Sequence, residues 1–229
     1  MTRILEEVVY RPGLTFAELT RAVDAPKSSV HGFVRGLLAT GWLHEEHRRF
    51  YIGPAVYGLT LASGRIPAGM VTHSDLDELH RDTGLAVFLG VLAGDHLIYI
   101  SEAGSDPVDG FNARSSIRRA PLATAGGKAL LAARSDPERE AYLRRRNPDE
   151  ADLVHTFLEE YEDIRSTRVA TNLRQSGMRY ALATTVDNAY GEAVASVTLV
   201  GRTADVQPRQ ARLREILISR VKSPTSGGQ

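Results

Sequence analysis

"VDAPKSSVHGFVRGLLATGWLHE", residues 23–45, decides how the N-terminal part of this chain folds. Pro26 suits the first turn of a helix, because the backbone N–H that proline lacks would have no partner there. Gly41 marks the end of the same helix. Between them, apolar side chains recur every three or four positions, which predicts a buried helical face formed by Val30, Phe33, Val34, Leu37 and Leu38.

Two shorter helices are expected before this one. Apolar residues at helical spacing predict the first helix over residues 2–10. Thr15 is followed three residues later by Glu18, which is the spacing of a capping box. A second helix is therefore expected over residues 15–23.

A small hairpin is expected after the third helix. Residues 42–44 and 50–52 are short extended stretches, and the charged segment 45–49 between them is compatible with a hairpin loop. Three helices closed by a hairpin describe a winged helix-turn-helix over residues 1–53. Outward side chains of its third helix reach base edges and phosphates, and the hairpin tip reaches the neighbouring backbone. The candidate DNA-binding residues are Thr15, Lys27, Ser28, Ser29, His31, Arg35, Arg48 and Arg49.

The charge of this region leaves another interpretation open. Residues 1–53 hold seven Lys and Arg against six Asp and Glu, a net charge of only +1, and the whole chain has a formal net charge of zero. No broad basic field marks a nucleic-acid-binding protein, so that role depends on local placement. A three-helix unit also serves in protein–protein contacts, and Glu45 and Glu46 would repel a phosphate backbone.

The rest of the chain predicts a linker followed by an α+β domain. Small residues over 54–68 favour a linker helix with a break near 64–67. Hairpin patterns mixed with helices over 69–222 indicate an antiparallel sheet, and the tail 223–229 is expected to be disordered. The expected helices of the larger domain lie at 74–83 and 125–133, in stretches within 137–146 and 153–175, and at about 208–221. The expected strands lie on both sides of 93–95, near Phe111, at 179–186 and at 193–200.

The composition excludes several kinds of site. The chain contains no cysteine, which excludes disulfides, thiol nucleophiles and thiolate metal sites. No apolar run approaches the roughly 20 residues that span a bilayer. Residues 1–11 lack the apolar block of a signal peptide, so we expect a cytoplasmic protein that has no membrane partner.

The motifs that could indicate catalysis or a cofactor are incomplete. Leu122 occupies a position where a phosphate-binding loop ending at Lys128 requires glycine. His44 and His47 lie three residues apart beside Glu45 and Glu46, but exposed histidines on a wing are far more often solvated than bound to a metal. No serine stands in a nucleophile elbow. We therefore expect no metal, no cofactor and no enzymatic activity.

Several blocks of the sequence resemble the isocitrate-lyase-regulator (IclR) family of bacterial transcription factors. In the N-terminal part they are GLTFAELTRAVDAPKSSVHGFVRGLLATGWL and FYIGPAVYGL, and in the C-terminal part RRAPLATAGGKALLA. SDLDELHRDTGLAVFLGVLAGDHLIYI is similar to the helix and first hairpin of the family's ligand-sensing domain, and GEAVASVTLVG is similar to its closing strand. The resemblance covers nearly the whole chain in the family's order.

The resemblance implies a winged-helix DNA-binding domain, a linker helix and a GAF-like effector-binding domain. It also implies homodimers, or tetramers made of two dimers, that bind partly palindromic double-stranded operators and respond to small organic acids or aromatic metabolites. A two-fold dimer suits this role, because it presents two recognition helices to half-sites about one helical turn apart.

The recognition-helix motif of the family is matched from Pro26 to His31 and is broken at Gly32, where arginine is usual. A bidentate arginine contact to a base is worth about 1–3 kcal/mol. Glycine inside a helix costs about 1 kcal/mol relative to alanine. The resemblance therefore implies modest DNA affinity or unusual sequence preference.

The sensing pocket of the family can be transferred to this chain by position. The backbone donors that bind a carboxylate map to Ala125 and Gly126, and free N–H groups at a helix start favour an anion in any protein. A position often held by cysteine maps to Tyr180, and two serines of the closing strand map to Thr198 and Val200. These side chains predict either a ligand other than a very small keto acid or a degenerate pocket, and they could equally pack the core.

Two functions remain open at this point. The first is a transcriptional regulator whose operator affinity changes with a small metabolite. The second is a small-molecule-binding or enzymatic dimer with a vestigial winged helix used for dimerisation, which Gly32 and the near-neutral N-terminal region favour. Residues 168–176 replace a longer family segment, so one wall of the pocket is left undefined by the resemblance.

Overall fold

A computed structural model of the protein describes residues 1–63, 71–105, 118–174 and 176–221. These residues form two compact units, one before residue 64 and one after residue 70. Each unit buries its own hydrophobic core, so each is described separately.

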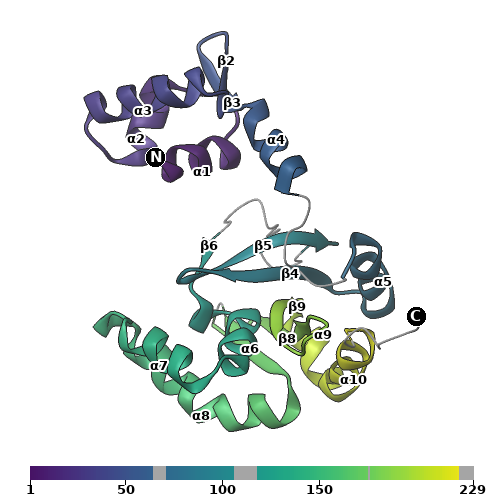
Figure 1. Cartoon of the computed structure of the whole chain (residues 1–229). Coiled ribbons are helices and arrows are strands. Elements are labelled where there is room, and N and C mark those ends of the chain that lie inside the picture. The colour runs from purple at the N-terminus through teal and green to yellow at the C-terminus, as the bar shows by residue number, and fades with distance from the viewer. Residues whose placement is uncertain (64–70, 106–117, 175, 222–229) are drawn as a thin grey trace. The chain divides into compact units, whose positions relative to one another are not determined.

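The first unit contains a three-stranded antiparallel sheet in the order β1-β3-β2 together with four helices (Figure 1). A single core joins the first three helices to the sheet through the side chains of Ile4, Val8, Leu19, Val30, Val34, Leu37, Leu43 and Phe50. This arrangement confirms the predicted winged helix-turn-helix. Its elements are α1 (Thr2–Tyr10), β1 (Leu14–Thr15), α2 (Phe16–Val23), α3 (Lys27–Ala39), β2 (Leu43–Glu46), β3 (Arg49–Ile52) and α4 (Pro54–Ser63).

The buried face of α3 is narrower than the sequence predicts. Val30, Val34 and Leu37 are buried, but the side chain of Phe33 is 47% exposed, so its assignment to the core was wrong. Successive residues of an α-helix are rotated by about 100°, so Phe33 points well away from its neighbour Val34. An apolar side chain therefore stands on the outer surface of this helix.

The hairpin of the first unit is tighter than expected. Glu45 pairs with Phe50 and Glu46 pairs with Arg49, so most of the predicted loop 45–49 belongs to the strands. The turn consists of His47 and Arg48, whose φ angles are 50° and 61°. Left-handed conformations at both positions make the type of two-residue turn whose twist matches antiparallel strands.

The second unit is built on a six-stranded sheet in the order β6-β5-β4-β9-β8-β7, in which every neighbouring pair is antiparallel. Its strands are β4 (Ala86–Ala93), β5 (His96–Ala103), β6 (Arg118–Arg119), β7 (Ala170–Arg174), β8 (Arg179–Asp187) and β9 (Ala193–Arg202). Its helices are α5 (His73–Thr83), α6 (Ala125–Ala133), α7 (Asp136–Arg144), α8 (Ala151–Thr167), α9 (Thr203–Val206) and α10 (Gln210–Arg220), with short 3₁₀ turns at Pro121–Ala123, Pro148–Glu150 and Gln207–Arg209.

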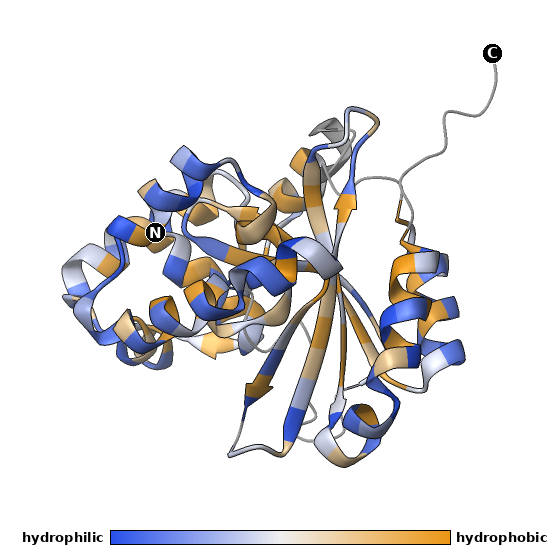
Figure 2. Ribbon diagram, turned by 90° about the horizontal axis from the view of Figure 1, so that it is seen from below, coloured by the Kyte–Doolittle hydropathy of each residue, from blue (hydrophilic) through white to orange (hydrophobic). Residues whose placement is uncertain are grey.

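Helices cover both faces of this sheet. On one face α5 and α10 pack through Leu76, Leu79, Leu213 and Leu217 against residues of β4, β8 and β9. On the other face α6 and α8 pack against the same sheet (Figure 1). The strands carry long hydrophobic stretches, whereas the helices alternate between hydrophilic and hydrophobic residues (Figure 2). This confirms the predicted α+β domain on an antiparallel sheet.

The helix expected within 153–175 is α8. It ends at Thr167, where Arg168 adopts a left-handed conformation with φ of 58°. The chain then turns into β7, whose residues pair with β8 along the edge of the sheet. Sheet pairing, which a local pattern does not contain, decided the conformation of these residues.

Several predictions fall outside the described residues. They concern the strand near Phe111, the break near 64–67 and the tail 223–229. The domain boundaries at residues 53, 68 and 222 stay predictions, because two of the three lie in these ranges.

Candidate functional site

The candidate DNA-binding face lies on α3. Lys27, Ser28, Ser29, His31 and Arg35 are all exposed, as predicted. Within the described residues, Lys27, Ser28, Ser29 and Arg35 show no side-chain hydrogen bond or ion pair to another protein group. His31 instead contacts Phe16 of α2 edge to face, with ring centroids 5.8 Å apart. Four hydrogen-bonding side chains are thus available to an external partner on one helix.

The centre of this face carries no side chain. Gly32 and Gly36 lie one turn apart, and a Cβ added at either position would meet no atom within 4 Å. Because neither glycine is required by packing, the missing side chains leave room for close approach of a duplex. The exposed ring of Phe33 follows Gly32 directly on this helix.

The two arginines of the hairpin differ in their contacts within the protein. Arg48 stands exposed in the turn, with its backbone left-handed. The Arg49 guanidinium instead donates to the carbonyl oxygen of Gly13 at 2.7 Å, which ties the hairpin to the segment before α2. Arg48 is therefore the better placed of the two for a phosphate contact.

Thr15 has a structural role that the sequence also predicted. Its hydroxyl accepts from the backbone N–H of Glu18 and donates to the Glu18 carboxylate at 2.7 Å, which completes the capping box of α2. The hydrogen bonds from the Thr15 backbone and side chain lower the pKa of Glu18. Thr15 stays a predicted DNA contact, but its hydroxyl is already engaged within the protein.

The candidate effector site lies at the start of α6. Thr124 caps the helix, because its hydroxyl accepts from the backbone N–H of Gly127 at 3.1 Å. No hydrogen bond to the N–H groups of Ala125 or Gly126 is found among the described residues. Two free N–H groups at the positive end of a helix favour an anion, as predicted from the sequence.

Gly126 allows this helix to lie directly against β9. A Cβ on Gly126 would lie 2.6 Å from the Ser196 hydroxyl oxygen and 2.8 Å from that of Thr198. Thr198 is 1% exposed, and its Oγ1 has no hydrogen-bond partner within the described residues. A buried hydroxyl without a partner is costly, so its position beside free N–H groups indicates a place for a ligand.

A small cavity of about 20 Å³, close to the space for one water molecule, adjoins this helix start. Its wall includes three of the predicted pocket residues, Ala125, Thr198 and Val200. The remaining residues of the wall are Tyr99, Arg119, Ala123, Thr124, Asn172, Arg174, Arg179 and Ala181. Ala125, Thr198 and Val200 are therefore brought together, and Gly126 lies against Thr198.

Tyr180, which was also predicted as a pocket residue, does not line this cavity. Side chains alternate between the two faces of a strand, and Ala181 is the residue paired with Val200 across β8 and β9. Tyr180 packs instead with the cluster on the opposite face, beside α5 and α10. The residues on either side of Tyr180, Arg179 and Ala181, point to the other face of β8 and line the cavity.

Three arginines of the wall were missed in the sequence. Arg119 belongs to β6 and Arg174 to β7, which are the two edge strands of the sheet, and Arg179 belongs to β8. Neighbouring strands lie about 4.8 Å apart, so opposite edges of a flat six-stranded sheet would be more than 20 Å apart. The sheet must curl strongly to bring both edges to one cavity, and no local pattern predicts that.

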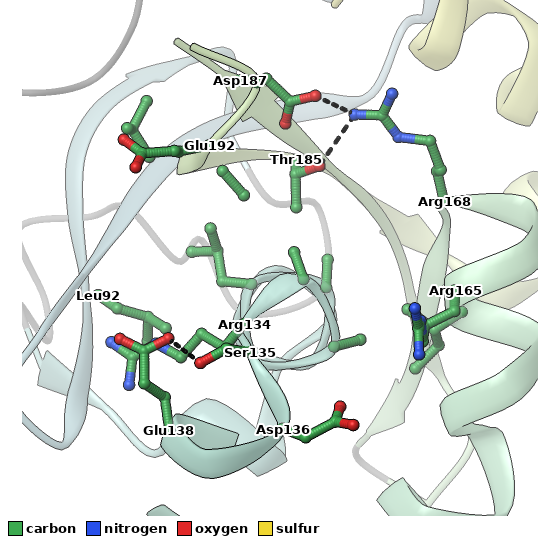
Figure 3. A pocket seen from close by; sticks show the side chains of 18 residues that line it. Leu92, Arg134, Ser135, Asp136, Glu138, Arg165, Arg168, Thr185, Asp187 and Glu192 are labelled. Atoms are coloured by element: carbon green, nitrogen blue, oxygen red, sulfur yellow. Dashed lines mark hydrogen bonds and ion pairs between the residues drawn. The ribbon is translucent and has the colours of Figure 1, made fainter.

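A larger cavity of about 860 Å³ lies at the other end of α6 (Figure 3). It lies beside the start of α7, the end of α8 and the turn between β8 and β9. Arg168 reaches across to Asp187 at 2.5 Å and to the Thr185 hydroxyl at 3.4 Å, while Ser135 donates to Glu138 (Figure 3). Side chains of opposite charge pair within its wall. The free backbone donors at the start of α6 adjoin the smaller cavity, because Ala125 lines it.

Lys128, the lysine of the GKA sequence, is structural. Its side chain is 3% exposed and its Nζ lies 2.5 Å from Glu160 of α8, so it ties α6 to α8. Its ammonium group is therefore engaged within the protein. No group of three histidine, aspartate or glutamate side chains is arranged to hold a metal among the residues that the structure describes.

Comparison with known proteins identifies the family. The family described as "Bacterial transcriptional regulator IclR C-terminal" matches residues 65–225, and the IclR helix-turn-helix domain matches residues 10–47. The chain belongs to the IclR family. It is a transcriptional regulator with an N-terminal helix-turn-helix unit and a C-terminal effector unit, as the resemblance implied.

Two relatives illustrate this membership. The chain is 28% identical over 211 residues to the HTH-type transcriptional regulator BhcR of Paracoccus denitrificans, covering 87% of this chain and 75% of BhcR. It is 30% identical over 146 residues to the HTH-type transcriptional regulator KipR of Bacillus subtilis, covering 62% of this chain and 57% of KipR. Both relatives are named as regulators.

Solved IclR structures share the fold. An IclR homologue from Microbacterium hydrocarbonoxydans, complexed with 4-hydroxybenzoate, superposes with a TM-score of 0.72 at 15% identity and covers 96% of both chains. The IclR protein of Thermotoga maritima gives a TM-score of 0.65 at 17% identity, covering 95% of this chain and 92% of its own. Among the helices that the structure describes, none is both long and apolar enough to cross a bilayer.

Proposed function

We propose that this IclR-family regulator binds a partly palindromic operator through α3 and releases or tightens it when a small organic anion occupies the site at the start of α6. The observation that carries the DNA-binding part is the exposed, unengaged set of Lys27, Ser28, Ser29 and Arg35 on one helix. These side chains provide cationic and hydroxyl donors at the end of the helix that enters the major groove in helix-turn-helix proteins.

Specificity and affinity would come from different residues. His31 is held against Phe16, so its ring has a fixed position from which to reach a base edge. Lys27, Arg35 and the turn residue Arg48 would contact phosphates, which raises affinity without reading sequence. Gly32 stands where the family usually has arginine, so this face lacks one guanidinium group. The proposed affinity for DNA is therefore moderate.

The proposed assembly is a homodimer, or a tetramer made of two dimers. A single recognition helix reads only a few base pairs, whereas a two-fold dimer reads two half-sites about one turn of DNA apart. As a regulator of bacterial DNA the protein would work in the cytoplasm, without catalytic activity or a cofactor of its own.

The effector part rests on the start of α6. The free N–H groups of Ala125 and Gly126, together with the orphaned hydroxyl of Thr198, would receive a carboxylate. Ligand and DNA would then affect each other's affinity by the same factor, because allosteric coupling is reciprocal.

A mobility-shift titration tests the proposed function. The full chain is titrated against the DNA directly upstream of its own gene and against a scrambled fragment of equal length and composition, at several salt concentrations. We expect specific binding that weakens steeply as salt rises. Equal affinity for both fragments would support the alternative, a small-molecule-binding dimer in which the winged helix serves dimerisation.

A further inference from the structure

The tip of the β2–β3 hairpin carries two histidines and two glutamates. His44, Glu45 and Glu46 belong to β2, and His47 is the first residue of the turn. All four side chains are exposed. The proposed contact between this hairpin and a phosphate backbone does not explain them, because two carboxylates beside phosphates are repelled.

The net charge of this segment depends on its histidines. Residues 44–49 hold two glutamates and two arginines, Arg48 and Arg49, so their formal net charge is zero when both histidines are neutral and +2 when both are protonated. Histidine is the side chain whose charge ordinarily changes between about pH 5 and 8. The hairpin therefore gains an excess of positive charge only when its histidines take up protons.

Both imidazoles are open to solvent. The side chain of His47 is 88% exposed, and its one charged contact among the described residues is the Glu46 carboxylate, 3.7 Å from Nδ1. His44 lies directly opposite Tyr51 of β3 and shows no hydrogen bond, ion pair or ring contact in the described part of the chain. A phosphate at the hairpin tip would therefore compete only with Glu46 for a protonated His47.

None of the neighbouring elements pairs with either histidine among the residues that the structure describes. Arg49 of β3 donates to the carbonyl oxygen of Gly13, and its charge interacts with Glu18 of α2. The other titratable or charged side chains on the helices around the hairpin are Arg3, Glu6, Glu7, Tyr10 and Arg11 of α1, Arg21 of α2, and Lys27, His31 and Arg35 of α3.

We propose that protons promote operator binding through this hairpin, so that the regulator binds DNA more tightly as the pH falls. The inference rests on the proposed function, because it requires the hairpin tip to lie beside a phosphate backbone. Protonated His44 and His47 add two positive charges beside Arg48 and offset the repulsion caused by Glu45 and Glu46. DNA binding then takes up protons, and an equilibrium that takes up protons weakens as the pH rises.

The proton is thus a second signal, separate from the effector. The hairpin belongs to the first unit, whereas the proposed anion site belongs to the second. Each histidine that reaches a phosphate adds about 0.9 to the salt dependence of log affinity, which corresponds to roughly an eightfold gain at about 0.1 M salt. Operator affinity should therefore depend on pH when no small molecule is present.

Mobility-shift titrations of the full chain without ligand test this inference. The upstream fragment and its scrambled counterpart are titrated at pH 6, 7 and 8 and at constant ionic strength. We expect operator affinity to fall at least about tenfold from pH 6 to pH 8. The slope of log affinity against log salt should be smaller at pH 8 by about 0.9 for each histidine.

A variant without either histidine identifies the groups that take up the protons. The double variant His44→Gln, His47→Asn should bind at pH 6 about as weakly as wild type binds at pH 8. Asparagine suits position 47 because it tolerates the left-handed φ of 50° there. His155→Gln is the matched control, because His155 is an exposed histidine of α8 that lies 3.2 Å from the carboxylate of Glu159. It should keep the pH dependence of wild type.

A second variant reproduces the charge of the protonated hairpin without histidine chemistry. The double variant Glu45→Gln, Glu46→Gln gives residues 44–49 a net charge of +2 at pH 8 and should bind there about tenfold more tightly than wild type. Circular dichroism at each pH verifies that every variant is folded.

Two results would overturn the proposal. They are an operator affinity that stays constant from pH 6 to pH 8, and a histidine-free double variant whose affinity falls as much as that of wild type, which would assign the protons to His31 or another group. Specific binding without pH dependence refutes only this inference. Absence of specific binding at every pH refutes the proposed function, and the inference with it.

Discussion

The hydroxyl oxygen of Thr198 lies 2.8 Å from the point that a Cβ on Gly126 would occupy. Helix α6 and strand β9 thus approach more closely than any side chain at this position permits. The same contact places an unpartnered hydroxyl beside the free N–H groups of the helix start. The packing of α6 on β9 and the proposed anion site therefore depend on the same glycine.

Gly126→Ala should destabilise the second unit. The new methyl group would overlap the hydroxyls of Ser196 and Thr198, and overpacking of this kind costs about 1–3 kcal/mol. Thermal unfolding followed by circular dichroism measures the loss. Gly32→Ala is the matched control, because open space surrounds Gly32 and alanine should stabilise α3 by about 0.5–1 kcal/mol. A neutral Gly126→Ala variant would contradict the close contact.

Gly32→Arg should strengthen operator binding. The position is exposed, its φ is ordinary, and nothing lies within 4 Å of the added Cβ, so an arginine can be accommodated without strain. One guanidinium contact to a base is worth about 1–3 kcal/mol, or roughly a tenfold to hundredfold gain in affinity. Mobility shift measures the gain, and Gly32→Ala separates it from improved helix propensity. Affinity that stays unchanged would place this face away from DNA.

Lys27→Ala should reduce the salt dependence of operator binding. If Lys27 contacts a phosphate, its removal lowers the slope of log affinity against log salt by about 0.9. Arg35→Ala should act similarly, and His31→Ala should instead alter the preferred sequence. Arg212→Ala on α10 serves as the control with an unchanged slope. An unaltered slope for both Lys27→Ala and Arg35→Ala would remove α3 from the interface.

Thr15→Val should show whether Thr15 is a cap or a DNA contact. Loss of the cap destabilises the first unit by about 1 kcal/mol, which fluorescence of Trp42, the single tryptophan, can follow during urea unfolding. Operator affinity of the folded variant should be unchanged. A fall in affinity larger than that caused by Lys27→Ala would instead support the contact predicted from the sequence.

The loss of stability caused by Thr15→Val should depend on pH. The pKa of Glu18 is lowered in the folded protein, so the stability that its ionised form provides is present above its ordinary value of 4.5 and is lost as the pH falls through the lowered value. The stability difference between wild type and Thr15→Val should therefore shrink in acid below that window. A difference that is constant from pH 7 to pH 3 would contradict the role of the ionised carboxylate.

The pair formed by Lys128 and Glu160 should respond asymmetrically to mutation. Lys128 is 3% exposed, whereas the Glu160 side chain is 35% exposed. Glu160→Leu leaves a buried ammonium group without its partner, while Lys128→Met leaves a carboxylate that water can reach. Thermal unfolding should show a larger loss for Glu160→Leu. Equal losses would mean that the buried lysine has another partner.

The local elements were predictable wherever a short-range signal decided them. The capping box of Thr15 and Glu18 fixed the start of α2, and the glycine-containing start of α6 was placed correctly at Ala125. Phe33 was predicted to be buried but is exposed, because a hydrophobic side chain is buried only where another surface packs against it. The strand β7 was not predicted, because it forms only by pairing with β8 along the edge of the sheet.

The two candidate sites also contain some residues that local sequence predicts and others that depend on the tertiary structure. The exposed polar residues of α3 follow from helical periodicity, which is set by the backbone geometry of a single helix. In the proposed effector site, the helix start at Ala125 and Gly126 could be predicted from its own backbone donors, whereas Thr198 and Val200 were transferred from the family resemblance. On β8 the cavity wall contains Arg179 and Ala181 and not Tyr180, because which face of a strand is inward depends on its partner strands.

By itself, the sequence determined the winged helix-turn-helix, the order of the two units and the polar face of α3, because these depend on periodicities and caps within a few residues. Only the tertiary structure decided that Arg119 and Arg174, from opposite edges of one sheet, face the same cavity. The physical reason is the curl of the sheet. It results from the summed twist and packing of six strands, and no segment of the chain contains it alone.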